Sequence, residues 1–222
     1  MTEAMFPLSL SLRTATLATL LVIPPGLLLA WLQARRPYPF RAVVDALVLL
    51  PLVLPPSVVG YLLVVLFGRR GPLGMWLEST LELRLIFSPG AVVLAAAVVA
   101  LPLLVKTAQP ALESVPLELE HVARTLGLGP WALFFRVTLP VAWPGIVAAI
   151  VLAFARALGE FGATLMFAGN IPGRTNTMPL EIFSAYQQGD GDRAALYVAI
   201  LVLLSCAVVF VAARFSPGTR LR

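Results

Sequence analysis

Long apolar stretches separated by short polar segments dominate the chain. Five such stretches cover residues 8–32, 44–67, 87–108, 141–168 and 194–213. A helix needs about 20 apolar residues to cross the hydrocarbon core of a bilayer, which is roughly 30 Å thick. Each stretch reaches that length, so the pattern predicts an all-α integral membrane protein with about five transmembrane helices. We expect them to form one domain over residues 1–222.

The first stretch admits a second interpretation, a cleaved signal peptide, which has a basic start and a short apolar core. No basic residue precedes Arg13, and the stretch is longer than such a core. We therefore expect a retained membrane span at residues 8–32.

The segment between the second and third stretches, residues 71–85, is too polar to cross a membrane. Its apolar residues recur at helical spacing beside charged ones: Leu73, Trp76, Leu77 and Leu81 beside Glu78, Glu82 and Arg84. This pattern is typical of a short amphipathic helix in the membrane interface, here the outer one. The alternative is an element that packs on the bundle itself.

Composition agrees with a membrane protein, and charge suggests its orientation. Hydrophobic residues make up 59% of the chain and charged residues 12%, against roughly 25% charged residues in a soluble domain. Nine basic residues fall in the loops after the first and third stretches and in the C-terminal tail, and five fall in the alternate loops. Because cytoplasmic loops are rich in Lys and Arg, we expect a multi-pass protein of the cytoplasmic (inner) membrane. Its N-terminus would lie outside and its C-terminus inside, with lipid rather than nucleic acid around it.

Prolines lie inside several stretches: Pro24, Pro25, Pro51, Pro55, Pro56 and Pro102. A proline inside a helix removes a hydrogen bond and clashes with the preceding turn. We therefore expect helix breaks at these positions. Lipid cannot form hydrogen bonds with the freed backbone carbonyls, but protein groups or a water-filled cavity can. Broken helices are common around the sites of transporters, so Pro55 and Pro56 are candidates for a translocation pathway. A static kink is the alternative.

No catalytic signature is present, so we expect neither enzymatic activity nor a bound cofactor. The only lysine, Lys106, is not preceded by glycine as a P-loop requires. A metal helix with two histidines is excluded because His121 is the only histidine. The string Gly189–Asp192 matches the GxGD of intramembrane proteases, but we interpret its aspartates as turn residues before the last stretch.

The long segment over residues 107–140 has the pattern of two short helices. Pro116 can open the first helix, and Gly127 can end it in a left-handed cap. An apolar face at helical spacing joins Leu119, Val122, Ala123 and Leu126. Pro130 starts the second helix. A hairpin of this kind suits docking into the groove of a soluble partner, and packing beneath its own bundle is the alternative.

This segment resembles the loop E-A-A-x3-G-x9-I-x-L-P of permease subunits in ATP-binding-cassette importers, the binding-protein-dependent transport permeases. The matching positions are His121, Val122, Ala123, Gly127, Val137, Leu139 and Pro140. His121 stands at the glutamate position, with Glu120 one residue earlier, and Val122 replaces the first alanine. The resemblance implies that the loop couples the membrane domain to a cytoplasmic ATP-binding subunit, and that this separate subunit hydrolyses ATP.

Further strings resemble the molybdate-type permeases of this family: 54–61, 68–74, 123–127, 154–164 and 169–175. The likeness runs from about Leu8 to Phe215. It implies a homodimer that moves molybdate or tungstate, delivered by an extracytoplasmic substrate-binding protein. Sulfate and thiosulfate permeases have similar strings and remain an alternative.

Two charges, Arg156 and Glu160, lie within the fourth stretch, four residues apart. Such charges are expensive in a membrane and should face the protein interior. They could line an anion pathway or only lock helices together. Two further alternatives are an ion-coupled carrier, which should hold more intramembrane acids, and a membrane scaffold, which would not need proline-broken spans.

Overall fold

The computed structural model describes residues 2–35 and 38–215, and this part of the chain contains helices and no strand. The all-helical fold expected from the sequence is confirmed. The helices are α1 (Thr2–Arg35), α2 (Arg41–Val53), α3 (Pro56–Phe67), α4 (Pro72–Leu81), α5 (Pro89–Glu113), α6 (Leu117–Thr125), α7 (Pro130–Leu133), a π-helical turn (Phe134–Thr138), α8 (Leu139–Leu158), α9 (Gly162–Ala168), α10 (Met178–Gln187) and α11 (Gly191–Phe215).

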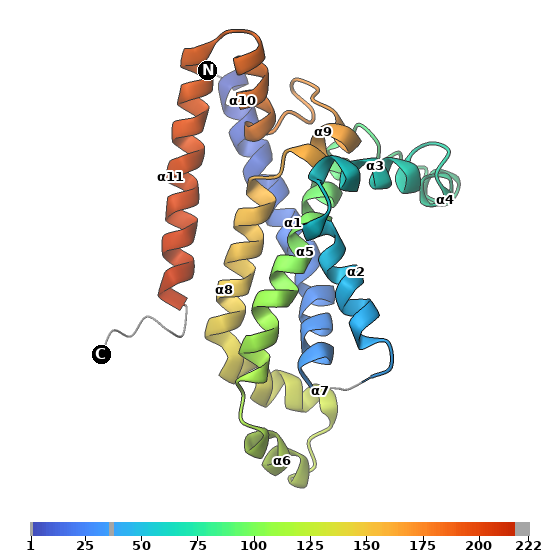
Figure 1. Cartoon of the computed structure of the whole chain (residues 1–222), viewed down its shortest axis with the longest axis vertical. Coiled ribbons are helices and arrows are strands. Elements are labelled where there is room, and N and C mark those ends of the chain that lie inside the picture. The colour runs from blue at the N-terminus through green and yellow to red at the C-terminus, as the bar shows by residue number, and fades with distance from the viewer. Residues whose placement is uncertain (1, 36–37, 216–222) are drawn as a thin grey trace.

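Helix α5 is the centre of the bundle and packs between α1 and α8 (Figure 1). In its most apolar stretch 61% of the residues are buried, against 6% for α11, which stands at the side of the bundle. Small side chains let the neighbouring backbones approach α5 closely. Its buried alanines are Ala91, Ala95, Ala96, Ala97, Ala100 and Ala108.

Four helices of the described residues are long and apolar enough to cross a membrane. They span Met5–Arg35, Pro89–Glu113, Pro130–Leu158 and Gly191–Arg214. The bent pair of α2 and α3 makes a fifth if it counts as one span. These numbers agree with the prediction of about five transmembrane helices.

The second stretch, residues 44–67, is not one straight helix. Helices α2 and α3 meet at a bend of 113°, with the break at Leu54 and Pro55. Helix α3 therefore turns away from the bundle axis toward α4 (Figure 1). Pro56 is the first residue of α3, where a missing N–H is tolerated.

The other prolines do not break their helices, so the expectation of a break was wrong for them. Pro24 and Pro25 lie inside α1, Pro51 inside α2 and Pro102 inside α5. Each proline removes one hydrogen bond from a helix whose remaining bonds and packing hold it together. The bend of 113° lies at the break that contains Pro55.

The fourth stretch, residues 141–168, also departs from a continuous helix. Helix α8 begins at Leu139 and ends at Leu158, and the short helix α9 follows after a break at residues 159–161. Helix α9 packs against α3 rather than extending α8. Both interruptions therefore lie side by side at one end of the bundle.

The two ends of the bundle differ in their elements (Figure 1). Helices α6 and α7 lie at one end, together with the end of α1. The start of α1, α9 and α10 lie at the other end, and α3 leads outward there to α4. The amphipathic helix expected at residues 71–85 is confirmed as α4, whose Leu73, Met75 and Trp76 are exposed.

Candidate functional site

The segment between α5 and α8 forms a projecting hairpin at one end of the bundle (Figure 1). We call residues 114–138 the α6–α7 hairpin. Helix α6 ends at Thr125, and Gly127 follows with a φ of 85°. The Leu128 N–H donates to the Ala123 carbonyl at 3.1 Å and closes the helix. The left-handed glycine cap expected from the sequence is confirmed.

Helix α6 exposes its large apolar side chains. Leu119 is 46% exposed, Val122 57% and Leu126 75%. These three residues belong to the apolar face that the sequence predicts for this helix. Ala123, which the sequence grouped with them, is buried. An apolar surface on a helix that extends beyond the bundle is favourable only when a partner covers it.

Glu120 lies on the opposite face of α6 and is 2% exposed. Its Oε1 lies 3.0 Å from Nε of Arg35, the last residue of α1. The hydroxyl of Thr138, which is fully buried just before α8, donates to the same Oε1 at 2.9 Å. Nη2 of Arg35 also donates to the Val115 carbonyl at 2.9 Å. One carboxylate thus joins α6 to the end of α1 and to the start of α8.

The sequence did not identify Glu120 or Arg35 as site residues. In the resemblance to the permease loop, Glu120 stands one residue before the glutamate position. The available signal was that Glu120 and Ala123 are three residues apart and share a helix face. His121, at the motif position, is exposed.

The remaining motif residues do not converge on one point. Val122 and Pro140 are exposed, whereas Val137, within the π-helical turn, and Leu139, directly after it, are half-buried. Gly127 lies at the tip of the hairpin with no heavy atom within 4 Å of an added Cβ. These positions therefore combine two roles, since some shape the hairpin and others lie on its exposed surface.

Aromatic rings anchor the second half of the hairpin to α1. The ring of Trp31 lies 6.1 Å from that of Trp131 and 5.5 Å from that of Phe134, measured between centroids. Aromatic pairs at such separations add to the energy of burial. The end of α1 thus contacts both helices of the hairpin, through Arg35 and through Trp31.

The charged pair Arg156 and Glu160 lies at the other end of α8. Nη1 of Arg156 is 2.8 Å from Oε2 of Glu160, which confirms that the two side chains pair. Glu160 lies beyond the end of α8, so the two residues do not share one continuous helix. Oε1 of Glu160 accepts a hydrogen bond from the Ala163 N–H at 2.9 Å and caps α9. The buried glutamate therefore stabilises the break, while the Arg156 side chain remains 27% exposed.

The contact between α3 and α9 brings Pro56 close to this pair. A Cβ added to Gly162 would lie 2.8 Å from Cβ of Pro56, and one added to Gly60 would lie 2.8 Å from the Ala163 carbonyl oxygen. Only glycine permits this approach of the two helices. The structure thus brings Pro55 and Pro56 to the break beside Glu160, as the sequence alone could not indicate.

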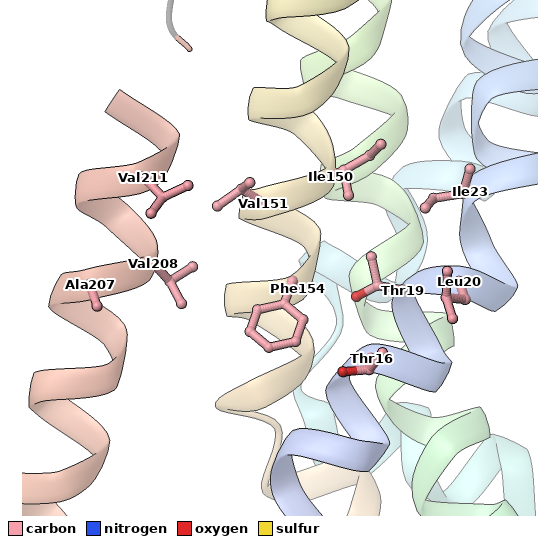
Figure 2. A pocket seen from close by; sticks show the side chains of 10 residues that line it. All are labelled: Thr16, Thr19, Leu20, Ile23, Ile150, Val151, Phe154, Ala207, Val208 and Val211. Carbon is pink, nitrogen blue, oxygen red and sulfur yellow. The ribbon is translucent and has the colours of Figure 1, made fainter. Parts of the chain in front are cut away.

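A different cleft, of about 480 Å³, lies between α1, α8 and α11 (Figure 2). Its lining is apolar except for Thr16 and Thr19. Both hydroxyls already donate to backbone carbonyls, Thr16 to Leu12 at 2.8 Å and Thr19 to Ala15 at 2.6 Å. No free donor faces the cleft in Figure 2, so it suits hydrocarbon chains and not an anion.

The loop before α10 is held by a network of polar side chains. The Asn176 amide donates to Oδ1 of Asn170 and to Oε2 of Glu181, each at 2.8 Å. Glu181 also forms an ion pair with Arg193 of α11. Among the described residues no group of three His, Cys, Asp or Glu side chains could hold a metal ion.

Comparison with known proteins gives one matching family and several close relatives. Residues 23–221 match the family model described as "Binding-protein-dependent transport system inner membrane component". The "Molybdenum transport system permease protein ModB" of Escherichia coli K12 is 48% identical over 192 residues, which cover 86% of this chain and 84% of that one. The "Probable sulfate transport system permease protein cysT" of Nephroselmis olivacea is 37% identical over 206 residues, 93% of this chain and 72% of that one.

The fold is also found among solved structures. A chain of the MetNI methionine ABC transporter in inward-facing conformations superposes with a TM-score of 0.69 at 18% identity. The superposition covers 96% of this chain and 92% of that chain. At this low identity the likeness concerns the fold alone.

The buried contact of Glu120 generates a prediction about the hairpin. Removing one partner of a buried ion pair costs about 3–5 kcal/mol, so Glu120→Ala should free the hairpin from α1 and α8. We expect faster hydrogen exchange of the backbone amides of residues 117–125, measured by mass spectrometry. Glu118→Ala is the matched control, since Glu118 lies exposed on the same helix. Equal exchange in the two variants would show that Glu120 does not hold the hairpin.

Proposed function

Because this chain belongs to the family of binding-protein-dependent transport system inner membrane components, we propose that it is the membrane-spanning permease subunit of an ATP-driven importer of molybdate. The observation that supports the transport mechanism most directly is the exposed apolar face of α6, formed by Leu119, Val122 and Leu126. Such a face on a projecting helix fits the groove of a soluble partner. The partner would be the cytoplasmic ATP-binding subunit.

The hairpin is built to transmit force rather than only to bind. Movement of α6 by a partner would be passed through Glu120 to Arg35 and Thr138, and hence to α1 and α8. Both helices are candidate membrane spans. In this mechanism ATP binding and hydrolysis in the partner would switch the permease between outward and inward access.

The substrate is proposed from the relatives. The molybdenum permease of Escherichia coli is more similar to this chain, at 48% identity, than the probable sulfate permease, at 37%. Molybdate, with tungstate as an analogue, is therefore the first candidate. Sulfate is the second, and an external binding protein would supply either oxyanion.

We place the α6–α7 hairpin in the cytoplasm and the start of α1 outside. The excess of basic residues on the hairpin side supports this orientation. We also propose a homodimer, which the membership of this family and the similarity to molybdenum permeases favour. In a dimer, the faces around Pro55, Pro56 and Arg156 would line the passage between the two copies.

The proposed function predicts ATP-dependent uptake of labelled molybdate by vesicles that contain this chain, its ATP-binding partner and its binding protein. Excess tungstate should abolish the uptake because it matches molybdate in charge, shape and size, and sulfate, which is a smaller tetrahedral dianion, should not. Inhibition by sulfate would assign the chain to the sulfate permeases. Uptake that is indifferent to ATP would contradict the ATP-driven mechanism.

The docking role of the hairpin predicts that Gly127→Trp separates ATP hydrolysis from transport. A Cβ added at Gly127 has no heavy atom within 4 Å, so the bulky side chain would extend from the tip of the hairpin and obstruct the partner's groove. We expect uptake to fall about tenfold, as a loss of roughly 1.4 kcal/mol at the interface would produce, while ATP hydrolysis continues.

The matched control for this variant is Gly189→Trp. Gly189 also has a positive φ, 75°, and no heavy atom within 4 Å of an added Cβ, but it lies in the loop between α10 and α11. It therefore reproduces the backbone strain at the opposite end of the bundle. Coupled transport in Gly127→Trp would argue strongly against docking at α6.

The proposed pathway predicts unequal effects for the two members of the charged pair. Arg156→Gln removes the partly exposed cation, whereas Glu160→Gln breaks the ion pair but keeps an oxygen to accept the Ala163 N–H. If Arg156 attracts the anion, uptake should fall about tenfold in Arg156→Gln and less in Glu160→Gln. Equal losses, paralleled by equal losses of thermal stability, would mean that the pair only holds the break together.

A further inference from the structure

A cavity of about 910 Å³ lies where α3 meets α4, at the end of the bundle opposite the hairpin. Four arginines line it: Arg69, Arg70, Arg84 and Arg174. Apolar side chains, among them Val64, Ile86 and Phe87, form the rest of its wall. We call this cavity the arginine basin.

The fold brings these arginines together from three separate segments. Arg69 and Arg70 lie in the turn between α3 and α4, Arg84 follows α4, and Arg174 belongs to the loop between α9 and α10. In the topology expected from the sequence, the loops on this side of the membrane hold five basic residues. Four of the five therefore share one cavity, although like charges repel and would otherwise be spread over the surface.

The basin carries little compensating charge. Arg84 is paired with Glu78, whose Oε1 lies 2.6 Å from its Nη2. For Arg69, Arg70 and Arg174 the described residues provide no ion pair, and no carboxylate belongs to the cavity lining. The unpaired guanidinium groups leave a positive potential that an anion would relieve, and guanidinium groups match oxyanions in geometry.

The backbone holds the first two arginines in a fixed turn. The Gly71 N–H donates to the Gly68 carbonyl at 2.8 Å, which closes the turn around Arg69 and Arg70. A Cβ on Gly71 would lie 2.5 Å from the Leu66 carbonyl oxygen, so the turn depends on glycine. Two neighbouring cations are thus presented by a rigid element, which lowers the entropic cost of binding.

We propose that the arginine basin binds a tetrahedral oxyanion group on the outer side of the membrane. Its position and the expected anion, molybdate, rest on the proposed function and orientation. The wall residue Val64 lies on α3, whose first residue Pro56 contacts α9 beside Glu160. An oxyanion released from a binding protein would be held here next to the candidate pathway. The phosphate of an anionic lipid has the same chemistry and is the other possible source of the group.

The test is direct binding of isotope-labelled molybdate to the full permease–ATPase complex in nanodiscs, without ATP and without binding protein. In discs of zwitterionic phosphatidylcholine we expect saturable binding that weakens as salt is added. The double variant Arg69→Gln/Arg174→Gln should lower the affinity about tenfold or more. Arg13→Gln is the matched control, because it removes an exposed arginine of α1 that does not line the basin.

Discs that contain phosphatidylglycerol distinguish the two sources. If the headgroup occupies the basin, the wild-type complex should retain phosphatidylglycerol through purification and the double variant should not. Molybdate would then bind only when this lipid is absent. The variant Arg69→Lys/Arg174→Lys keeps the charge and should retain most of the binding, which separates loss of charge from loss of folding.

The anion site would be overturned if neither molybdate nor phosphatidylglycerol distinguishes the wild-type complex from the double variant. Failure of the proposed function looks different, because ATP-dependent uptake by the wild-type complex is measured independently of the basin. Normal uptake without basin binding would reject the basin alone.

Discussion

The buried carboxylate of Glu120 is the contact on which the geometry of the hairpin end depends. A charge with 2% exposure is stable only when it is paired. Besides Arg124 of α6 itself, its partners here come from the end of α1 and the start of α8. Because the partners belong to different helices, the hairpin cannot tilt without moving one of them or breaking the pair. Helix α6 is thereby attached to the bundle on one face, and its apolar side chains remain free on the other.

The same principle, one buried acid at a point where the backbone is interrupted, recurs at the opposite end. Glu160 lies between α8 and α9, where it caps an N–H of α9 and pairs with Arg156. In a membrane, freed backbone groups and buried charges are each costly. Placing the acid at the break lets one side chain satisfy both demands, and the glycines at positions 60 and 162 let α3 close over it.

The sequence predicted what depends on local pattern. Apolar length indicated the spans, and the glycine cap at Gly127 and the helix at residues 72–81 followed from residue spacing. The prolines were harder, because a proline inside a long packed helix is tolerated and the sequence does not show how well its neighbours hold it. Pro24 and Pro102 are spanned by continuous helices, whereas the chain turns by 113° at Pro55.

The contacts of Glu120 and the arginine basin join residues far apart in the chain, which no local pattern reveals. Arg35 and Glu120 are 85 positions apart, and Arg69 and Arg174 are separated by more than 100. For such pairs only the charge itself is visible in the sequence. For Arg156 and Glu160 the sequence correctly indicated a pair at a spacing of four. It did not indicate that α8 ends between them.

Exposed apolar residues have opposite meanings in the two environments of this chain. On α11, where only 6% of the most apolar stretch is buried, exposed side chains are what lipid requires and indicate no partner. On α6 the same residue types lie beyond the spans, where water makes them unfavourable. Charged residues also have to be interpreted by their surroundings. A single exposed arginine in water needs no explanation, but four arginines that share one cavity do. In this chain a residue indicates binding when its chemistry does not suit its surroundings. The exposed apolar side chains of α6 indicate a partner, and the clustered arginines beside α3 indicate an anion.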